Sequence, residues 1–141
     1  MVNPTPPPAI SPAPAHTILI VEDDSFISLF LQKKLKELGY EAIVATSTAQ
    51  GLEGLGSQTV SIILLDIILP DENGFTLLER LKKNPSYEAI PVVILSNLGQ
   101  QSEIDRGKAL GAIDFMVKGN YSPAEIVDRI TAILKQQPPH A

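Results

Sequence analysis

Ile62-Ile63-Leu64-Leu65-Asp66 is the stretch that decides the fold of this chain. Four consecutive aliphatic residues are typical of a strand that is buried on both faces, as in a parallel sheet. The carboxylate that follows them is costly to bury unpaired. We therefore expect Asp66 at the carboxyl end of the strand, on the rim of the sheet and facing a cleft.

Four other short apolar runs also predict strands, and helical patterns alternate with them. The predicted strands cover residues 17–21, 41–45, 61–65, 92–95 and 113–117, and the predicted helices begin near Ser25, Ser47, Gly74, Ser102 and Ser122. This alternation predicts a doubly wound α/β fold, in which a five-stranded parallel sheet carries helices on both faces. Ligands of such sheets bind beyond the carboxyl ends of the strands.

Local patterns make several expectations about the helices specific. Ser25 is the expected cap of the first helix. The apolar residues of that helix keep a helical spacing and predict a buried stripe of Ile27, Phe30, Leu31, Leu35 and Leu38. Ser47 and Gln50 form an expected capping box for the second helix. The fourth helix, near 102–110, is thinly apolar and is therefore a candidate for motion.

Composition restricts the class of protein. The chain has 141 residues, 44% of them hydrophobic, and a net charge of −5, which favours a globular protein and argues against a general nucleic-acid binder. Since it contains no cysteine, disulfides and thiolate metal sites are excluded. His16 and His140 are expected to be exposed to solvent. Neither a signal peptide nor a membrane-spanning run is visible, so we expect a cytoplasmic protein.

The chain divides into three predicted segments. Residues 1–15 hold half of the 12 prolines and no charged side chain, which predicts an extended, disordered tail. Residues 16–136 form the predicted single domain, and residues 137–141 a C-terminal tail.

Polar residues with useful chemistry follow four of the five predicted strands: Glu22, Asp23, Asp24, Asp66, Ser96 and Lys118. Because parallel strands end at a common edge, these side chains are expected on one rim. Carboxylates that face a lysine make an oxygen-rich site suited to Mg²⁺ and a phosphate. Each residue alone has a plainer interpretation, since acidic runs often only favour a helix N-terminus and loop serines and strand-end lysines are common. Their conjunction favours function.

The chain from about Thr17 to Leu134 resembles the receiver domain of two-component response regulators, with a chemotaxis-regulator-like organisation. The matching motifs are ILIVEDD (18–24), LLDIILPDENG (64–74), VVILS (92–96) and GAIDFMVK (111–118). The resemblance implies a flavodoxin-like fold with strand order 2-1-3-4-5.

It also implies a role for each acidic residue of the rim. Asp66 stands at the position of the phosphoacceptor, and its donor would be a phosphohistidine on a sensor histidine kinase or a phosphotransfer protein. Asp23 would bind Mg²⁺ directly and Glu22 through a water. The Asp66 carboxylate and the backbone carbonyl of Ile68 would complete the ligands, while Asp24 would act as a helix-end charge.

The remaining implied roles concern the phosphoryl group and the output. Ser96 matches the hydroxyl residue that bonds the phosphoryl group, and Lys118 matches the lysine that neutralises it. Ser96 and Phe115 are the implied switch residues, and the fourth helix, fifth strand and fifth helix would contact a downstream protein. Because few residues follow the last predicted helix, we expect a stand-alone regulator, not an enzyme beyond its own phosphorylation and dephosphorylation. Direct binding to nucleic acid and membrane insertion are not expected; a homodimer is a further option.

The sequence departs from the family pattern at several positions. Phe115 stands where the family commonly has tyrosine. Gly119 stands where a cis proline is usual, and because a non-proline cis bond costs about 2.5–4 kcal/mol we predict a trans Lys118–Gly119 bond. The resemblance implies that Ile68 and Leu98 flank the approach of water to an acyl phosphate. Neither side chain can orient that water, which predicts slow dephosphorylation; the alternative is that both side chains turn outward to bind a partner and leave the water free.

Three other classes were weighed against this interpretation. A pseudo-receiver that binds partners without phosphorylation would usually lack one of the acidic residues, the aspartate or the lysine, and none is missing here. A flavin- or nucleotide-binding enzyme would want a phosphate-cradling loop after the first strand, where this chain has carboxylates. A structural module would not need the polar rim.

Overall fold

The computed structural model describes residues 16–136, so the predicted tails and His140 lie outside the described residues. In chain order the elements are β1 (Thr17–Val21), α1 (Ser25–Glu37), β2 (Glu41–Ala45), α2 (Thr48–Ser57), β3 (Ile62–Leu65), α3 (Gly74–Lys82), β4 (Val92–Ser96), α4 (Gln101–Ala109), β5 (Asp114–Val117), a 3₁₀ turn (Lys118–Asn120) and α5 (Pro123–Lys135).

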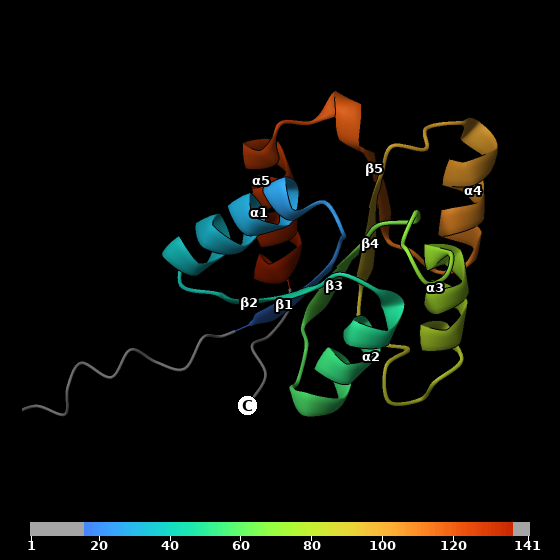
Figure 1. Cartoon of the computed structure of the whole chain (residues 1–141), viewed down its shortest axis with the longest axis horizontal. Helices are drawn as coiled ribbons and strands as arrows, with labels where there is room; N and C mark the ends of the chain where they lie inside the picture. The colour runs from blue at the N-terminus through green and yellow to red at the C-terminus, as the bar shows by residue number, and fades with distance from the viewer. Residues whose placement is uncertain (1–15, 137–141) are drawn as a thin grey trace, which may run out of the picture.

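The five strands form one parallel sheet in the order β2-β1-β3-β4-β5. Helices α1 and α5 cover one face, and α2, α3 and α4 cover the other (Figure 1). Alternate residues of β1 supply both cores, because successive side chains of a strand point to opposite faces: Ile18 and Ile20 pack with α1 and α5, Leu19 and Val21 with the other helices. The doubly wound, flavodoxin-like fold is confirmed.

The central strand β3 is buried throughout, as its four aliphatic residues predicted. Its ladder continues into Asp66, whose backbone N–H donates to the Val21 carbonyl oxygen at 2.9 Å. The last strand residues of β1 and β3 therefore stand side by side, and the polar residues that follow them emerge at one edge.

The start of α1 differs from the expectation. The N-cap is Asp24 and not Ser25, because the Asp24 carboxylate accepts hydrogen bonds from the backbone N–H groups of Phe26 and Ile27, at 3.0 and 3.4 Å. The expected stripe is also too wide: Leu31 is fully buried, whereas Phe30 is exposed. Leu38, just past the end of the helix, is exposed too. The helix rests on the sheet and α5 along a narrow line that Leu31 and Leu35 fill.

The predicted capping box of α2 is wrong in one half. Ser47 caps the helix by accepting a hydrogen bond from the Gln50 N–H at 3.1 Å. The Gln50 side chain, however, accepts from the backbone and hydroxyl of Thr46, at 2.8 and 2.9 Å, and fixes the turn before the helix.

The expectation of an exposed His16 is wrong. Its side chain is only 6% exposed, and its Nδ1 lies 2.9 Å from the Ser61 hydroxyl oxygen. His16 directly precedes β1, which has neighbours on both sides, and its carbonyl oxygen accepts from the Glu41 N–H, so the strands around it bury the ring.

Helix α4 buries few residues, as its thin apolar pattern predicted. Gly107 is its one buried residue within the described range, and Ile104 is only partly buried. A Cβ at Gly107 would lie 2.6 Å from Ile94 Cδ1 and 3.0 Å from Phe115 Cδ2, so the glycine lets this helix approach the sheet.

Gly74 supports a close backbone approach and gives a prediction about stability. A Cβ there would overlap the Asp66 carbonyl oxygen and lie 2.8 Å from Ile67 Cα. Both atoms belong to the backbone, so Gly74→Ala is expected to lower the free energy of unfolding by about 2 kcal/mol or more, as measured by urea denaturation. Gly56→Ala is the control: a Cβ there meets nothing within 4 Å, so alanine should raise the free energy of unfolding by roughly 0.5–1 kcal/mol. Equal effects of both substitutions would contradict this account.

Asp71, in the loop after β3, bonds to the start of α2. Its Oδ2 accepts hydrogen bonds from the Thr48 hydroxyl at 2.7 Å and the Ala49 N–H at 3.1 Å, and its Oδ1 accepts from the Thr48 N–H at 3.0 Å. The Thr48 hydroxyl, followed by these backbone groups, holds the pKa of Asp71 well below its ordinary value.

This shift predicts a pH-dependent contribution to stability. A carboxyl whose pKa is lower in the folded than in the unfolded chain stabilises the fold above the unfolded pKa of about 3.9, and the contribution disappears as the pH falls through the folded pKa. We expect Asp71→Ala to lower the melting temperature by a constant amount between about pH 5 and 7, and by progressively less below about pH 4. Thermal melts of both proteins across this range measure the difference; a difference that grows on acidification would oppose the assignment.

Candidate functional site

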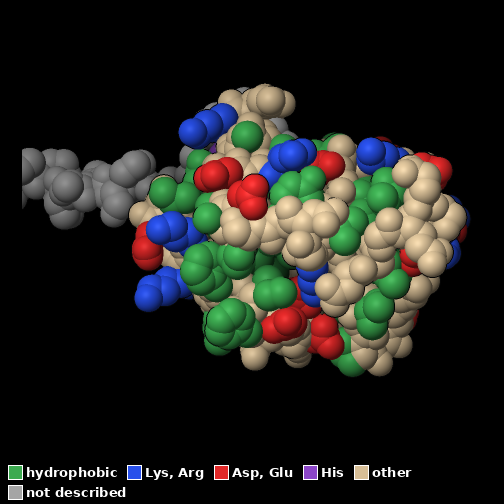
Figure 2. Space-filling view, turned by 90° about the horizontal axis from the view of Figure 1, so that it is seen from above, with side chains coloured by type: hydrophobic (Ala, Val, Ile, Leu, Met, Phe, Trp, Pro, Cys, Tyr) green, Lys and Arg blue, Asp and Glu red, His purple; other side chains and the backbone are tan. Residues whose placement is uncertain are grey.

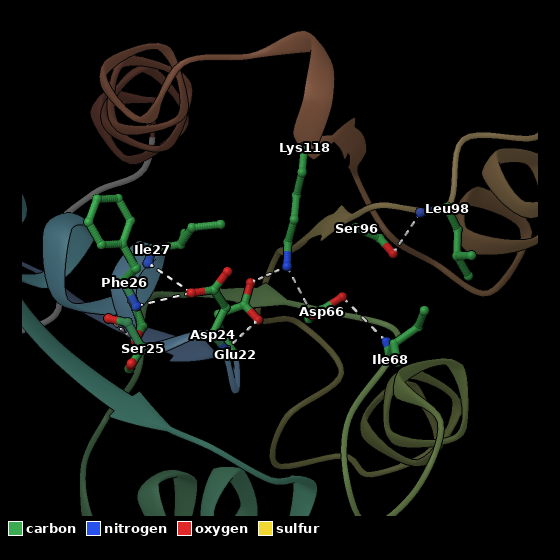
Figure 3. A network of polar contacts seen from close by, with 11 residues as sticks. Glu22, Asp24, Ser25, Phe26, Ile27, Asp66, Ile68, Ser96, Leu98 and Lys118 are labelled. Atoms are coloured by element: carbon green, nitrogen blue, oxygen red, sulfur yellow. Dashed lines mark hydrogen bonds and ion pairs between the residues drawn. The ribbon is translucent and has the colours of Figure 1, made fainter.

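The structure gathers the predicted rim residues at the carboxyl ends of β1, β3, β4 and β5 (Figure 3). Lys118, in the turn after β5, reaches across the rim. Its Nζ lies 2.6 Å from Glu22 Oε1 and 3.1 Å from Asp66 Oδ2. Three residues from three separate strand ends thus form one ion-paired cluster.

Burial gives this cluster unusual electrostatics. Glu22 and Asp66 are 2% and 5% exposed. Burial, together with the neighbouring Asp66 carboxylate, raises the pKa of Glu22 to about 7, although Lys118 acts in the opposite direction. For Lys118 itself burial acts to lower the pKa, but Glu22 and Asp66 together outweigh it and raise the pKa. The single cation is therefore held firmly in its charged form between two crowded carboxylates.

The cluster also fits a metal ion. Glu22, Asp23 and Asp66 each offer one carboxylate oxygen, and the three oxygens lie within 4.8 Å of one another. The buried Glu22 Oε1 accepts no aligned hydrogen bond, although it contacts Lys118. An all-oxygen, multiply charged donor set with an incompletely satisfied buried oxygen matches the ligands that hard divalent cations prefer.

Ile68 occupies a distinct place beside Asp66. Its backbone N–H donates to Asp66 Oδ1 at 3.3 Å, so its backbone lies next to the carboxylate. Its side chain is 57% exposed and is directed away from the acidic cluster (Figure 3). The residue therefore has its main chain at the site and its apolar side chain at the surface.

Ser96 and Phe115, the predicted switch residues, lie in the half of the sheet nearest α4. Ser96 is completely buried, and its hydroxyl oxygen accepts a hydrogen bond from the Leu98 N–H at 3.2 Å. Phe115 is buried on β5 beneath Gly107 of α4. Phe115 thus packs against α4, and Ser96 ends the neighbouring strand β4 at the rim.

The peptide bond between Lys118 and Gly119 is trans, as predicted, and no peptide bond within residues 16–136 is cis. Gly119 does not adopt a positive φ. It lies in the 3₁₀ turn, where an added Cβ would meet nothing within 4 Å.

Two features of the site region were missed from the sequence. One is an exposed apolar face of α1 formed by Phe26, Leu29 and Phe30, which are 80%, 60% and 41% exposed. With Lys33 these residues keep the helical spacing i, i+3, i+4, i+7. The sequence therefore contained a signal for a second face of the helix, but Phe30 was assigned to the buried face instead. The other is the bond from Asp71 to Thr48, which no local pattern indicates because the residues are 23 positions apart.

Within residues 16–136, every helix is too short or too polar to cross a lipid bilayer.

Comparison with known proteins gives the same family throughout. The family described as response regulator receiver domain matches residues 18–131. The phosphate regulon transcriptional regulatory protein PhoB of Pseudomonas aeruginosa is 34% identical over 123 residues, which cover 87% of this chain and 53% of PhoB. The chain therefore spans about half the length of this curated relative.

Solved structures agree. A response regulator from Chloroflexus aurantiacus J-10-fl superposes with a TM-score of 0.76 at 32% identity, covering 85% of this chain and 98% of the other. The receiver domain of the Francisella response regulator 1452 gives a TM-score of 0.77 at 27% identity, covering 86% and 98%. With sheet order, acidic rim and relatives in agreement, the chain belongs to the response regulator receiver domains of two-component systems.

Proposed function

We propose that this receiver domain accepts a phosphoryl group on Asp66 in a Mg²⁺-dependent reaction and signals by a conformational change to a partner protein. One observation carries the proposal. At the end of the buried central strand, Asp66 contacts Lys118, and its carboxylate lies close enough to those of Glu22 and Asp23 for the three to bind one metal ion. A carboxylate that only ends a strand would need neither the lysine nor the two acidic neighbours.

This geometry supports a direct transfer. An Asp66 oxygen attacks the phosphorus in line, a new O–P bond forms, and the N–P bond of a phosphohistidine donor breaks with its electron pair returning to the imidazole. Lys118 neutralises charge on the equatorial oxygens, and the Ser96 hydroxyl donates to one of them after leaving its bond with Leu98. Bound Mg²⁺, held by Glu22, Asp23, Asp66 and the Ile68 carbonyl, would supply further neutralisation of that charge.

Output is proposed to pass through α4. Movement of Ser96 toward the phosphoryl group would pull the loop after β4, and α4 packs on the core with only Gly107 buried and Ile104 partly buried. This movement would shift the equilibrium between two conformations of the surface formed by α4, β5 and α5. Phe115, beneath that surface, would be the switch aromatic. A downstream protein would contact that surface, and a second copy of the chain is an alternative occupant.

The donor is proposed to be a cytoplasmic sensor histidine kinase or phosphotransfer protein that docks on the exposed face of α1. Hydrophobic side chains gather over this helix beside the acidic rim when the molecule is viewed onto the carboxyl ends of its strands (Figure 2). A nearly fully exposed phenylalanine so close to a reaction site is typical of an interface anchor. The adjoining surface is lined by three lysines and one glutamate, and this excess of positive charge would favour an acidic partner: Lys33, Lys34, Lys36 and Glu37.

This docking face gives a prediction that separates binding from chemistry. Phe26→Ala is expected to slow phosphotransfer from the protein donor at least tenfold, because truncated interface anchors typically cost 2 kcal/mol or more, about 30-fold. Labelling by acetyl phosphate, which needs no docking, should stay within about twofold. Ile113→Ala, which alters an exposed residue outside α1, is the control for general surface effects. Equal slowing with both donors would mean that Phe26 supports the site and not the partner.

The proposal is tested by incubating the protein with acetyl phosphate, with and without Mg²⁺. We expect a mass gain of one phosphoryl group that needs Mg²⁺, survives acid and is lost in base, as befits an acyl phosphate. A protein that binds Mg²⁺ but is never labelled would instead be a binding module without phosphoryl transfer. That the receiver domain stands alone stays a prediction. It is tested by measuring the length of the polypeptide isolated from its source cells.

A further inference from the structure

The Asp71 carboxylate connects the loop after β3, which follows Asp66, to the start of α2, the helix that packs on β1. It accepts hydrogen bonds from both the hydroxyl and the N–H of Thr48, a residue that is 3% exposed, and from the N–H of Ala49. The first turn of α2 contains no acidic residue of its own. Asp71 therefore supplies from another loop the negative charge that a helix N-terminus favours.

The helix that receives Asp71 is itself fixed on β1. A Cβ at Gly51, in the first turn and a half of α2, would lie 3.2 Å from Val21 Cγ2. Val21 is the last residue of β1 and immediately precedes Glu22 and Asp23. The position of α2 is thus tied to the strand end that carries two of the three clustered carboxylates.

The loop that carries Asp71 leads out of the other half of the cluster. It starts at Asp66, continues through Ile68, whose N–H bonds to the Asp66 carboxylate, and ends at Gly74, whose N–H donates to the Ile67 carbonyl oxygen at 2.7 Å. Between these two attachments to the end of β3, the Asp71 side chain bonds to α2, whereas the side chains of Glu72 and Asn73 contact α3, the helix that follows the loop.

We propose that Asp71 is a positioning residue for the metal ion: by holding the loop after β3 against the helix packed on β1, it fixes the Ile68 backbone and Asp66 relative to Glu22 and Asp23. The proposal rests on the metal site proposed above. Asp71 does not touch the ion or the phosphoryl group. Its effect is on the spacing of the groups that do, as outer partners of metal ligands generally act.

The test measures Mg²⁺ affinity of the unphosphorylated full chain by calorimetry and by amide NMR shifts. Asp71→Asn is expected to weaken binding roughly tenfold. The labelling rate at saturating Mg²⁺ should stay within about twofold, since Asp71 acts on assembly of the site. Thr48→Val, which removes the hydroxyl partner without changing charge or volume, should weaken binding in the same direction. Both substitutions disrupt the same hydrogen bond, so their effects on Mg²⁺ affinity should not add. The double variant should bind Mg²⁺ more tightly than the product of the two single effects predicts.

Two controls separate positioning from simpler effects. Glu72→Gln removes the same charge from the same loop, where Glu72 pairs with Arg80 at 3.2 Å. Ser47→Ala removes the ordinary cap of α2 and leaves the loop untouched. Both should bind Mg²⁺ within about twofold of the unmodified protein.

The outcomes distinguish the alternatives. If Glu72→Gln weakens Mg²⁺ binding as much as Asp71→Asn, the effect is one of charge alone. If Ser47→Ala weakens it as much, the effect is one of helix stability alone. Either result overturns the inference, and so does an unchanged Mg²⁺ affinity of Asp71→Asn. Should Asp71→Asn fail to fold, Thr48→Val decides alone. An unmodified protein that binds no Mg²⁺ overturns the inference together with the metal site. One that binds Mg²⁺ but is not labelled removes the phosphorylation proposal while the affinity comparison still stands.

Discussion

Asp66→Ala is expected to abolish Mg²⁺-dependent labelling by acetyl phosphate, reducing it to the level measured without the metal. The nucleophilic oxygen is lost. Among residues 16–136, Glu22 is the one other carboxylate that pairs with Lys118. A covalent acceptor cannot be replaced by binding energy from its neighbours.

The matched control is Asp24→Asn, which changes another aspartate of the same rim while keeping its helix cap. This variant should be labelled like the unmodified protein, as quantified by intact mass after equal incubation. Labelling of the Asp66→Ala protein at the unmodified level would show that the acceptor is elsewhere.

The second large effect concerns the lifetime of the phosphorylated state. An acyl phosphate is hydrolysed when a water attacks in line, and that water needs a polar group to orient it. By the family resemblance Ile68 and Leu98 would flank this approach, and neither side chain can form a hydrogen bond. Loss of an orienting contact of about 1–2 kcal/mol slows the attack roughly 5- to 30-fold.

Ile68→Asn and Leu98→Glu are therefore expected to accelerate decay of the labelled protein by roughly 5- to 30-fold. Leu98 packs partly on the core, whereas the exposed Ile68 side chain is directed away from the acidic cluster (Figure 3), so an asparagine at position 68 must turn back toward Asp66 to orient the water. Ile113→Asn, at an exposed isoleucine away from the rim, should leave the decay unchanged. If neither rim variant decays faster, the apolar side chains do not shield the phosphoryl group.

The parts of this fold that could be predicted were those encoded by short, continuous patterns. The apolar runs ending at Val21 and Leu65 predicted buried strands, and the polar residues after them fell on one rim because parallel strands share an edge. Lys118 could be assigned to the cluster for the same reason, although its 2.6 Å contact with Glu22 could not.

The errors arose where a residue's environment depends on distant parts of the chain. Phe30 satisfied a helical stripe, but the width of the buried face depends on how α1 sits on the sheet and α5. His16 was judged by its closeness to a chain end, whereas β2 and Ser61 bury it. Asp71 resembled an ordinary turn residue, and only the folded structure shows its bond to α2.

The most direct test of the central claim is chemical mapping of the phosphorylated residue in the unmodified protein. After incubation with acetyl phosphate and Mg²⁺, borohydride reduction converts a phosphorylated aspartate to homoserine, and peptide mass spectrometry locates it. We predict homoserine at position 66 alone, and none when Mg²⁺ is removed by chelation. Homoserine at position 23 or 24, or equal conversion without Mg²⁺, would contradict the proposed mechanism.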